Sequence, residues 1–170
     1  MKQFAAPLMA LALAGTLSGC GLHPLYSGGS SGVVATTLTR IQVAPIEGKS
    51  GWLMTNALND RLAADGAAPL YRLEVKLDDK IIGLGVRADD SVSRERRSLR
   101  ARYQLIDLAH GTVLLDATAG SDAGIDVVNS EYATIAAENT ALERLSGIVA
   151  EQIVSRVALY AQRTAAAPAK

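Results

Sequence analysis

The sequence predicts a two-layer α+β domain, in which two helices cover one face of a four-stranded, mainly antiparallel sheet in the order β-α-β-β-β-α. Three observations support this class. Residues 70–82, 99–108 and 112–118 alternate between apolar and polar side chains, as strands with one wet face do. Residues 50–65 and 130–163 carry apolar side chains at helical spacing. Short turns between the later strands favour antiparallel neighbours.

The first residues have the features of a secretory signal. Lys2 precedes an apolar run over residues 4–17, and Leu17-Ser18-Gly19-Cys20 follows as a lipobox. About fourteen apolar residues are too few to cross a ~30 Å hydrocarbon core. The pattern resembles a bacterial lipoprotein precursor, which implies cleavage before Cys20 and covalent lipid on that residue. We therefore expect a signal peptide over residues 1–19.

A lipid-anchored tether is expected over residues 20–36, because residues 28–32 are rich in glycine and serine. Its apolar cluster at residues 22–26 fits either the lipid interface or a partner surface. The folded domain is expected over residues 37–163, with a disordered tail at 164–170.

The domain is expected to begin with a strand over residues 37–46 that ends at Pro45. A helix follows from Ser50, a possible N-cap, to Asp65, and Gly66 is placed at its C′ position.

The next expected strand covers residues 70–82, and Gly83 and Asp89-Asp90 indicate a loop after it. Two more strands, 99–108 and 112–118, flank a turn at 109–111. Residues 119–130 read as a loop, with Val127 and Val128 as a possible strand extension. The final helix is expected to bury a stripe at Ile135, Leu142, Leu145, Val149, Ile153 and Tyr160.

Composition excludes several functions. Formal charge is zero and only 4% of residues are aromatic, so nucleic acid is not an expected partner. Cys20 is the only cysteine, which leaves no internal disulfide. The two histidines, His23 and His110, lack the spacing of a metal site. No catalytic constellation is found, although His110 is the one histidine that a Ser-His-Asp arrangement could use. We expect no enzyme, no metal and no cofactor beyond the lipid on Cys20.

Residues 87–102 hold half of the chain's arginines. In a strand, those at even positions project from one face. The neighbouring strand would add three more basic residues to that face. The expected contacts with an anionic lipid or a protein partner are Arg94, Arg96, Arg100, Arg102, Arg72, Lys76 and Lys80. The alternative is a solvated face on which Glu74 and Asp78 neutralise the basic groups.

Two segments carry a family resemblance. Cys20-Gly21-Leu22-His23-Pro24-Leu25-Tyr26 and Ser130-Glu131-Tyr132-Ala133-Thr134-Ile135-Ala136-Ala137-Glu138 resemble the lipopolysaccharide-assembly lipoprotein family LptE, in its alphaproteobacterial form. The order of elements agrees with the fold of that family.

The resemblance implies a non-enzymatic subunit of the lipopolysaccharide translocon. Such a subunit plugs an LptD-type outer-membrane β-barrel, helps it to assemble, and is thought to bind lipopolysaccharide. The implied location is the periplasmic side of the outer membrane, held by the lipid anchor, and Gly21 is consistent with that sorting. The alternative is a free-standing outer-membrane lipoprotein that binds another anionic lipid or is structural.

Overall fold

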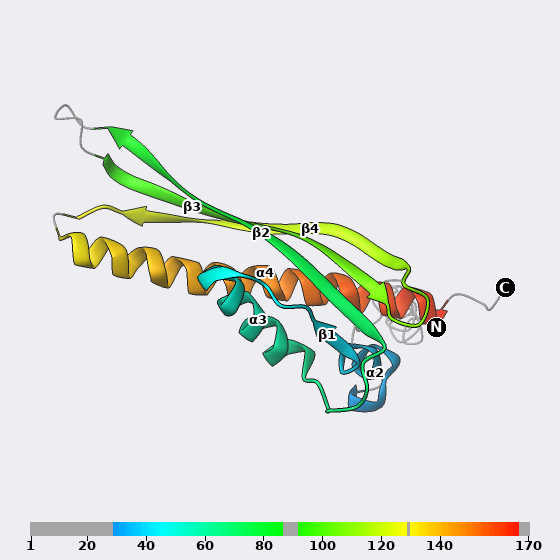
Figure 1. Ribbon diagram of the computed structural model, residues 1–170. Coiled ribbons are helices and arrows are strands. Elements are labelled where there is room, and N and C mark those ends of the chain that lie inside the picture. The colour runs from blue at the N-terminus through cyan, green and yellow to red at the C-terminus, as the bar shows by residue number, and fades with distance from the viewer. Residues whose placement is uncertain (1–28, 87–91, 129, 167–170) are drawn as a thin grey trace, which may run out of the picture.

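The computed structural model describes residues 29–86, 92–128 and 130–166. Two helices lie against one face of a four-stranded sheet: α3 (Gly48–Leu62) and the long α4 (Glu131–Ala166), which runs along most of the sheet (Figure 1). The predicted α+β class is confirmed. The strands are β1 (Ile41–Val43), β2 (Tyr71–Val86), β3 (Val92–Asp107) and β4 (Val113–Asp126).

The strands are arranged in the order β1-β2-β3-β4. β1 is parallel to β2, and the other neighbouring pairs are antiparallel. Helix α3 makes the crossover that a parallel pair needs. β2 and β3, of 16 residues each, form a long hairpin whose far end projects beyond α3 (Figure 1).

The later strands are longer than predicted. β2 continues past Gly83 to Val86, and the expected loop at 119–126 is instead the second half of β4. Both errors arose because glycine, serine and aspartate were taken as turn residues, whereas pairing along β3 holds these segments extended. The expected loop residues Asp89 and Asp90 lie outside the described residues.

The beginning of the domain also differs from the expectation. Only residues 41–43 of the predicted 37–46 strand are extended. A helix, α2 (Val33–Leu38), precedes them and buries Val34 and Leu38, and Gly29–Ser31 form a 3-10 turn, η2. β-branched residues were taken as a strand signal, but the Thr37 hydroxyl bonds to the Val33 carbonyl at 2.7 Å within the helix. The signal segment and Cys20 lie outside the described residues.

Helix α3 begins at Gly48 rather than Ser50, and its N-cap Glu47 makes no side-chain capping bond. It ends with Ala63 in the left-handed region (φ 49°), so Gly66 is not the C′ residue. Gly51 is buried, and a side chain there would clash with the carbonyl of Ile46. This glycine therefore lets the first turn of α3 lie close to the loop before it.

The core lies between the sheet and the helices. From the sheet it takes Leu73, Leu99, Tyr103 and Leu105, from α3 Met54 and Leu58, and from α4 Leu142, Leu145, Val149 and Ile153. Burying each large side chain contributes roughly 1.5–3 kcal/mol. Ile135, expected in the stripe, is 47% exposed because it lies in the first turns of α4, at the far end of the hairpin. None of the helices in the described ranges is long and apolar enough to cross a membrane.

Candidate functional site on the outer face of the sheet

The surface of the sheet that faces away from α4 carries most of its charge. Successive strand residues point to opposite faces. Odd positions such as Leu73, Leu99 and Tyr103 are buried, whereas the even positions between them are largely exposed. We call this second surface the outer face. It holds the whole predicted basic set, all exposed: Arg72, Lys76, Lys80, Arg94, Arg96, Arg100 and Arg102.

Three of the arginines on β3 are paired with aspartates on β4. Arg94 reaches Asp126 at 3.0 Å, Arg100 reaches Asp122 at 2.8 Å and Arg102 reaches Asp116 at 3.0 Å. Sequence reasoning missed these partners, since Asp122 and Asp126 fell in a predicted loop. The signal that could have indicated a strand here was the alternation of aspartates with small residues through 116–126. The arginines therefore form a cross-strand ladder of ion pairs rather than a bare basic row.

Arg100 is the most closely held of these side chains. Its Nη2 donates to both carboxylate oxygens of Asp122, at 3.0 and 2.8 Å, and its Nη1 donates to the Ser121 carbonyl at 2.9 Å. The chain lies flat across Gly120, where a Cβ atom would stand only 2.5 Å from the Arg100 Cδ. A glycine on β4 is thus required for this arginine to reach its partner.

Two of these pairs favour the ionised form of their aspartates. Hydrogen bonds from Arg100 and then Ser98 lower the pKa of Asp122, and those from Arg102 and then Gln104 lower the pKa of Asp116. Because the carboxylates remain charged across the neutral range, they cancel most of the positive potential of their partners. Exposed pairs of this kind contribute little to stability.

Two cations on the outer face remain without an ion pair among the described residues. Arg72 pairs with Glu74 at 3.1 Å and Lys80 with Asp78 at 2.8 Å, as the solvated-face alternative expected. Lys76 and Arg96 have no carboxylate within 4 Å in the described ranges. Seven basic and five acidic groups leave the outer face with an excess of two positive charges.

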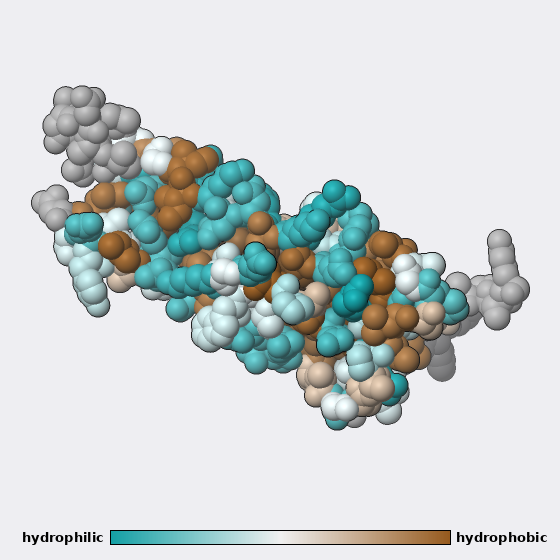
Figure 2. Space-filling view, in the orientation of Figure 1, coloured by the Kyte–Doolittle hydropathy of each residue, from teal (hydrophilic) through white to brown (hydrophobic). Residues whose placement is uncertain are grey.

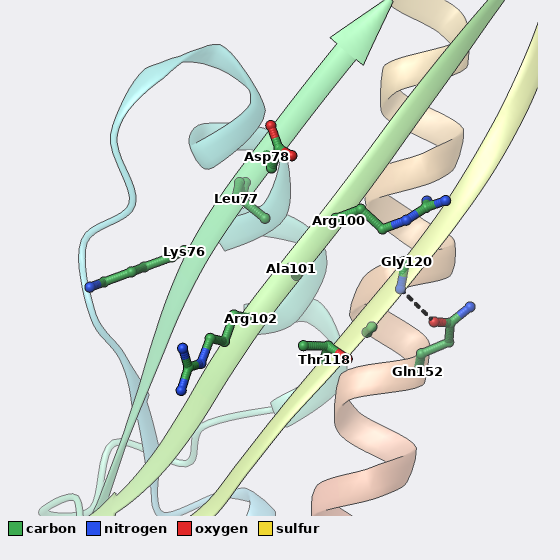
Figure 3. A pocket seen from close by; sticks show the side chains of 10 residues that line it. Lys76, Leu77, Asp78, Arg100, Ala101, Arg102, Thr118, Gly120 and Gln152 are labelled. Carbon is green, nitrogen blue, oxygen red and sulfur yellow. Dashed lines mark hydrogen bonds between the residues drawn. The ribbon is translucent and has the colours of Figure 1, made fainter.

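A shallow depression crosses the middle of the outer face (Figure 3). Lys76 and Arg102 lie on one side of it, and Arg100 extends to the other side, toward Gly120 and Gln152. The Gly120 N–H donates to the Gln152 Oε1 at 3.1 Å, which ties the open edge of β4 to α4. Of the three basic residues that line the depression, only Lys76 has no ion pair within the described ranges.

The far end of the outer face combines cations with apolar side chains. On β2, Ile82 and Leu84 are 45% and 37% exposed. They stand directly opposite Arg96 and Arg94 on β3. An apolar pair beside two guanidinium groups matches a ligand with both acyl and phosphate parts.

Beneath the sheet, a separate set of charges joins the hairpin to α4. Arg97 donates to Asp79 through Nε at 2.8 Å and Nη2 at 2.6 Å, and through Nη1 to the Glu138 carbonyl at 2.9 Å. Burial, followed by the nearby Glu138, raises the pKa of Glu95. Arg97 belongs to the same arginine-rich stretch, but its odd position turns it inward, into a structural role.

No catalytic site emerges from the described residues. His110 lies 74% exposed in a turn and its Nδ1 contacts the Asp107 carboxylate at 2.7 Å. This contact lowers the pKa of Asp107 and closes the turn. The described ranges contain no cluster of three His, Cys, Asp or Glu side chains able to hold a metal ion.

A model of the family described as LptE, lipopolysaccharide-assembly, matches residues 38–157. The chain belongs to the LptE family. This is a family of non-enzymatic, membrane-associated lipoproteins of lipopolysaccharide assembly, and the match spans the sheet, α3 and most of α4. The predicted family is thereby confirmed, and the match includes the segment 130–138 but not residues 20–26.

Solved structures of other bacterial lipoproteins share the fold of this LptE-family chain. A Caulobacter crescentus protein described as a lipoprotein is 26% identical, with a TM-score of 0.66, over 79% of this chain and 98% of the other. A minor lipoprotein of Acinetobacter baumannii is 14% identical (TM-score 0.54; 70% and 88% covered). Lipoprotein B of Nitrosomonas europaea is 16% identical (TM-score 0.54; 74% and 83%). No curated protein sequence matches the chain.

Proposed function

We propose that this protein is the lipoprotein subunit of an outer-membrane lipopolysaccharide translocon. It is anchored by lipid on Cys20 after removal of residues 1–19. It plugs an LptD-type β-barrel and helps that barrel to assemble. Its outer face contacts lipopolysaccharide. Membership in the LptE family is the observation that carries the proposal.

The shape and polarity of the domain support the plug. A barrel lumen is polar and filled with water, so an inserted domain needs a polar surface. The ladder of ion pairs from β3 to β4 gives the outer face that character without a large net charge. The lowered pKa values of Asp116 and Asp122 keep these two carboxylates ionised at neutral pH, so the face stays hydrated until the barrel wall covers it.

The lipid contact is supported by the two unpaired cations. Neither Lys76 nor Arg96 forms an ion pair with a described carboxylate, although Arg96 also acts on Asp122 from a longer distance. Phosphate groups of lipid A bind guanidinium and ammonium groups through charge-assisted hydrogen bonds. Acyl chains would meet Ile82 and Leu84, next to Arg96 and Arg94.

Co-purification tests the partner. The tagged full-length protein, extracted from outer membranes in mild detergent, should be recovered with a large β-barrel protein. Recovery without a barrel would contradict the translocon role and favour the free-standing lipoprotein.

Lipopolysaccharide binding tests the outer face. The double variant Lys76→Ser/Arg96→Ser should bind lipopolysaccharide about tenfold more weakly at low salt, with a smaller loss at high salt. The control Arg144→Ser/Arg163→Ser removes the same charge from exposed positions on α4, away from the outer face, and should bind as the wild type does. Equal losses in both variants would show that only overall charge matters.

A further inference from the structure

Two loops meet at the end of the domain where the chain enters. Residues 66–70 precede β2 and residues 108–113 link β3 to β4, and every one of them is exposed. Their backbones are joined, since the Leu108 N–H donates to the Leu70 carbonyl at 3.0 Å. We call these two segments the base loops.

The base loops are apolar and carry no formal charge. Neither contains Asp, Glu, Lys or Arg, and His110 is their one titratable residue. Leu70, Leu108 and Val113 are 49%, 40% and 52% exposed. Figure 2 shows hydrophobic atoms gathered at this end, over the beginnings of β2 and β4 and the end of β3. Covering such a surface requires little desolvation of polar side chains.

The described part of the chain begins at the same end. A groove there is lined by Val33 and Thr37 of α2 together with Asp107 and Leu114, so α2 lies beside the base loops. Cys20 lies nine residues before Gly29, the first described residue, and a chain of that length reaches about 30 Å at most. The hairpin of β2 and β3 extends about 50 Å in the other direction. A lipid on Cys20 therefore keeps the base loops near the leaflet that holds it.

We propose that, before the barrel is engaged, the base loops rest on the phospholipid leaflet that holds the Cys20 anchor. The domain then stands with Ile82 and Leu84 directed away from the membrane. The alternative of lying on the outer face would desolvate its charged ladder. Contact at the base adds apolar area to the anchor and presents the far end of the hairpin to an incoming partner. This inference rests on the proposed lipid attachment.

A single fluorescent label tests the contact. In the lipidated protein the Cys20 thiol is blocked, so a cysteine introduced by Leu108→Cys is the only free thiol. Labelled there with an environment-sensitive dye and placed in phosphatidylethanolamine–phosphatidylglycerol vesicles, it should shift its emission to the blue and be quenched severalfold by nitroxide-labelled lipid. The matched variant Leu84→Cys, also exposed but at the far end, should show neither effect.

Two outcomes would overturn the contact. Equal quenching at both positions, or stronger quenching at Leu84→Cys, would show another orientation. Blue emission from Leu108→Cys in the unlipidated Cys20→Ser chain without vesicles would show that residues 22–26 or a second copy already cover the loops. Failure of the lipid attachment is distinguished separately, because the mass of the mature protein would then lack the acyl chains.

Discussion

At the scale of single residues, Gly120 and Gly124 show why the outer face depends on small side chains. Both lie on β4 at even positions, opposite Arg100 and Arg96. A Cβ at Gly120 would collide with the Arg100 side chain, whereas a Cβ at Gly124 would meet nothing within 4 Å. The two glycines look alike in the sequence but differ in the space around them. They therefore provide a test variant and its matched control.

Replacing Gly120 should disturb one ion pair and leave the fold intact. In Gly120→Ala, the Arg100 side chain must move off β4, so its hydrogen bonds to Asp122 weaken. The pKa of Asp122, which those bonds lower, should rise toward its ordinary value. A carboxyl NMR titration measures this. Gly124→Ala should leave that titration unchanged, and a shift of equal size there would contradict the steric argument.

Glu95 should make stability depend on pH in the opposite sense to the outer aspartates. Burial and Glu138 raise its pKa in the folded state, so between the unfolded and folded pKa values the folded protein holds the extra proton. The free energy of unfolding contributed by this group falls as the pH rises through that window. Glu95→Gln should therefore be more stable than the wild type at pH 7 and no more stable near pH 4.

Chemical denaturation at the two pH values measures the difference. Glu143→Gln, at an exposed position of the same helix that Glu138 occupies, serves as the control. A gain for Glu95→Gln that is the same at both pH values would mean that ionisation of Glu95 is not its cause.

At the scale of elements, polar contacts help to hold the far half of the hairpin to α4. On β2 and β3 the buried apolar side chains end near Leu99, and Ile81 beyond it is 40% exposed, contrary to the inward position that alternation predicted, although Ala123 and Ile125 of β4 stay buried farther along. Arg97 fills that gap, since its side chain, only 12% exposed, bonds both Asp79 on β2 and the Glu138 carbonyl on α4. A partly buried, bidentate pair of this kind is stronger than the exposed ion pairs on the outer face.

Removing one partner of this pair should destabilise the domain. Asp79→Ala leaves the largely buried Arg97 guanidinium with one carbonyl acceptor, and we expect the free energy of unfolding to fall by about 2–3 kcal/mol. The neighbouring Asp78→Ala breaks only an exposed pair and should cost less than about 1 kcal/mol. Urea unfolding followed by circular dichroism distinguishes them. Asp79→Leu/Arg97→Met should recover most of the loss, and no recovery would point to a role beyond pairing.

The sequence predicted the elements with strong periodicity and failed where pairing or packing decided the conformation. Helix α4 and the alternating parts of β2 and β3 were recognised, because one apolar face repeats over many residues. The second half of β4 was missed, since Gly120, Asp122 and Gly124 are poor strand residues in isolation. The helix α2 was missed because residues up to 36 were assigned to the tether and Thr37 to a strand, and only burial of Val34 and Leu38 against the core reveals it.

The candidate site was likewise predicted where periodicity is strong and missed where strand pairing decides. Alternation along β3 correctly brought the arginines onto one face. Their partners on β4 depended on a strand that local sequence did not indicate, so the charge of that face was overestimated. Only long-range pairing shows that Lys76 and Arg96 remain without carboxylate partners among the described residues.

At the scale of the whole molecule, the domain has two unlike ends. The base loops are apolar, uncharged and close to the anchor, and the opposite end combines Ile82 and Leu84 with arginines. The hairpin between them is about 50 Å long. The apolar band of an outer-membrane barrel is only about 25 Å tall. A domain that enters the lumen with its far end first is thus long enough to run through the whole band.

This asymmetry predicts which end meets the barrel. A photoreactive amino acid at Leu84 should cross-link to the β-barrel partner in intact cells, because the far end of the hairpin lies within the lumen of the assembled complex. The same group at Leu108 should give little barrel product, since the base loops remain outside the lumen. Both positions are similarly exposed in the free domain, so reactivity alone cannot separate them. Cross-links to the barrel from Leu108 and none from Leu84 would contradict this orientation. They would require the domain to enter the lumen with its base loops first.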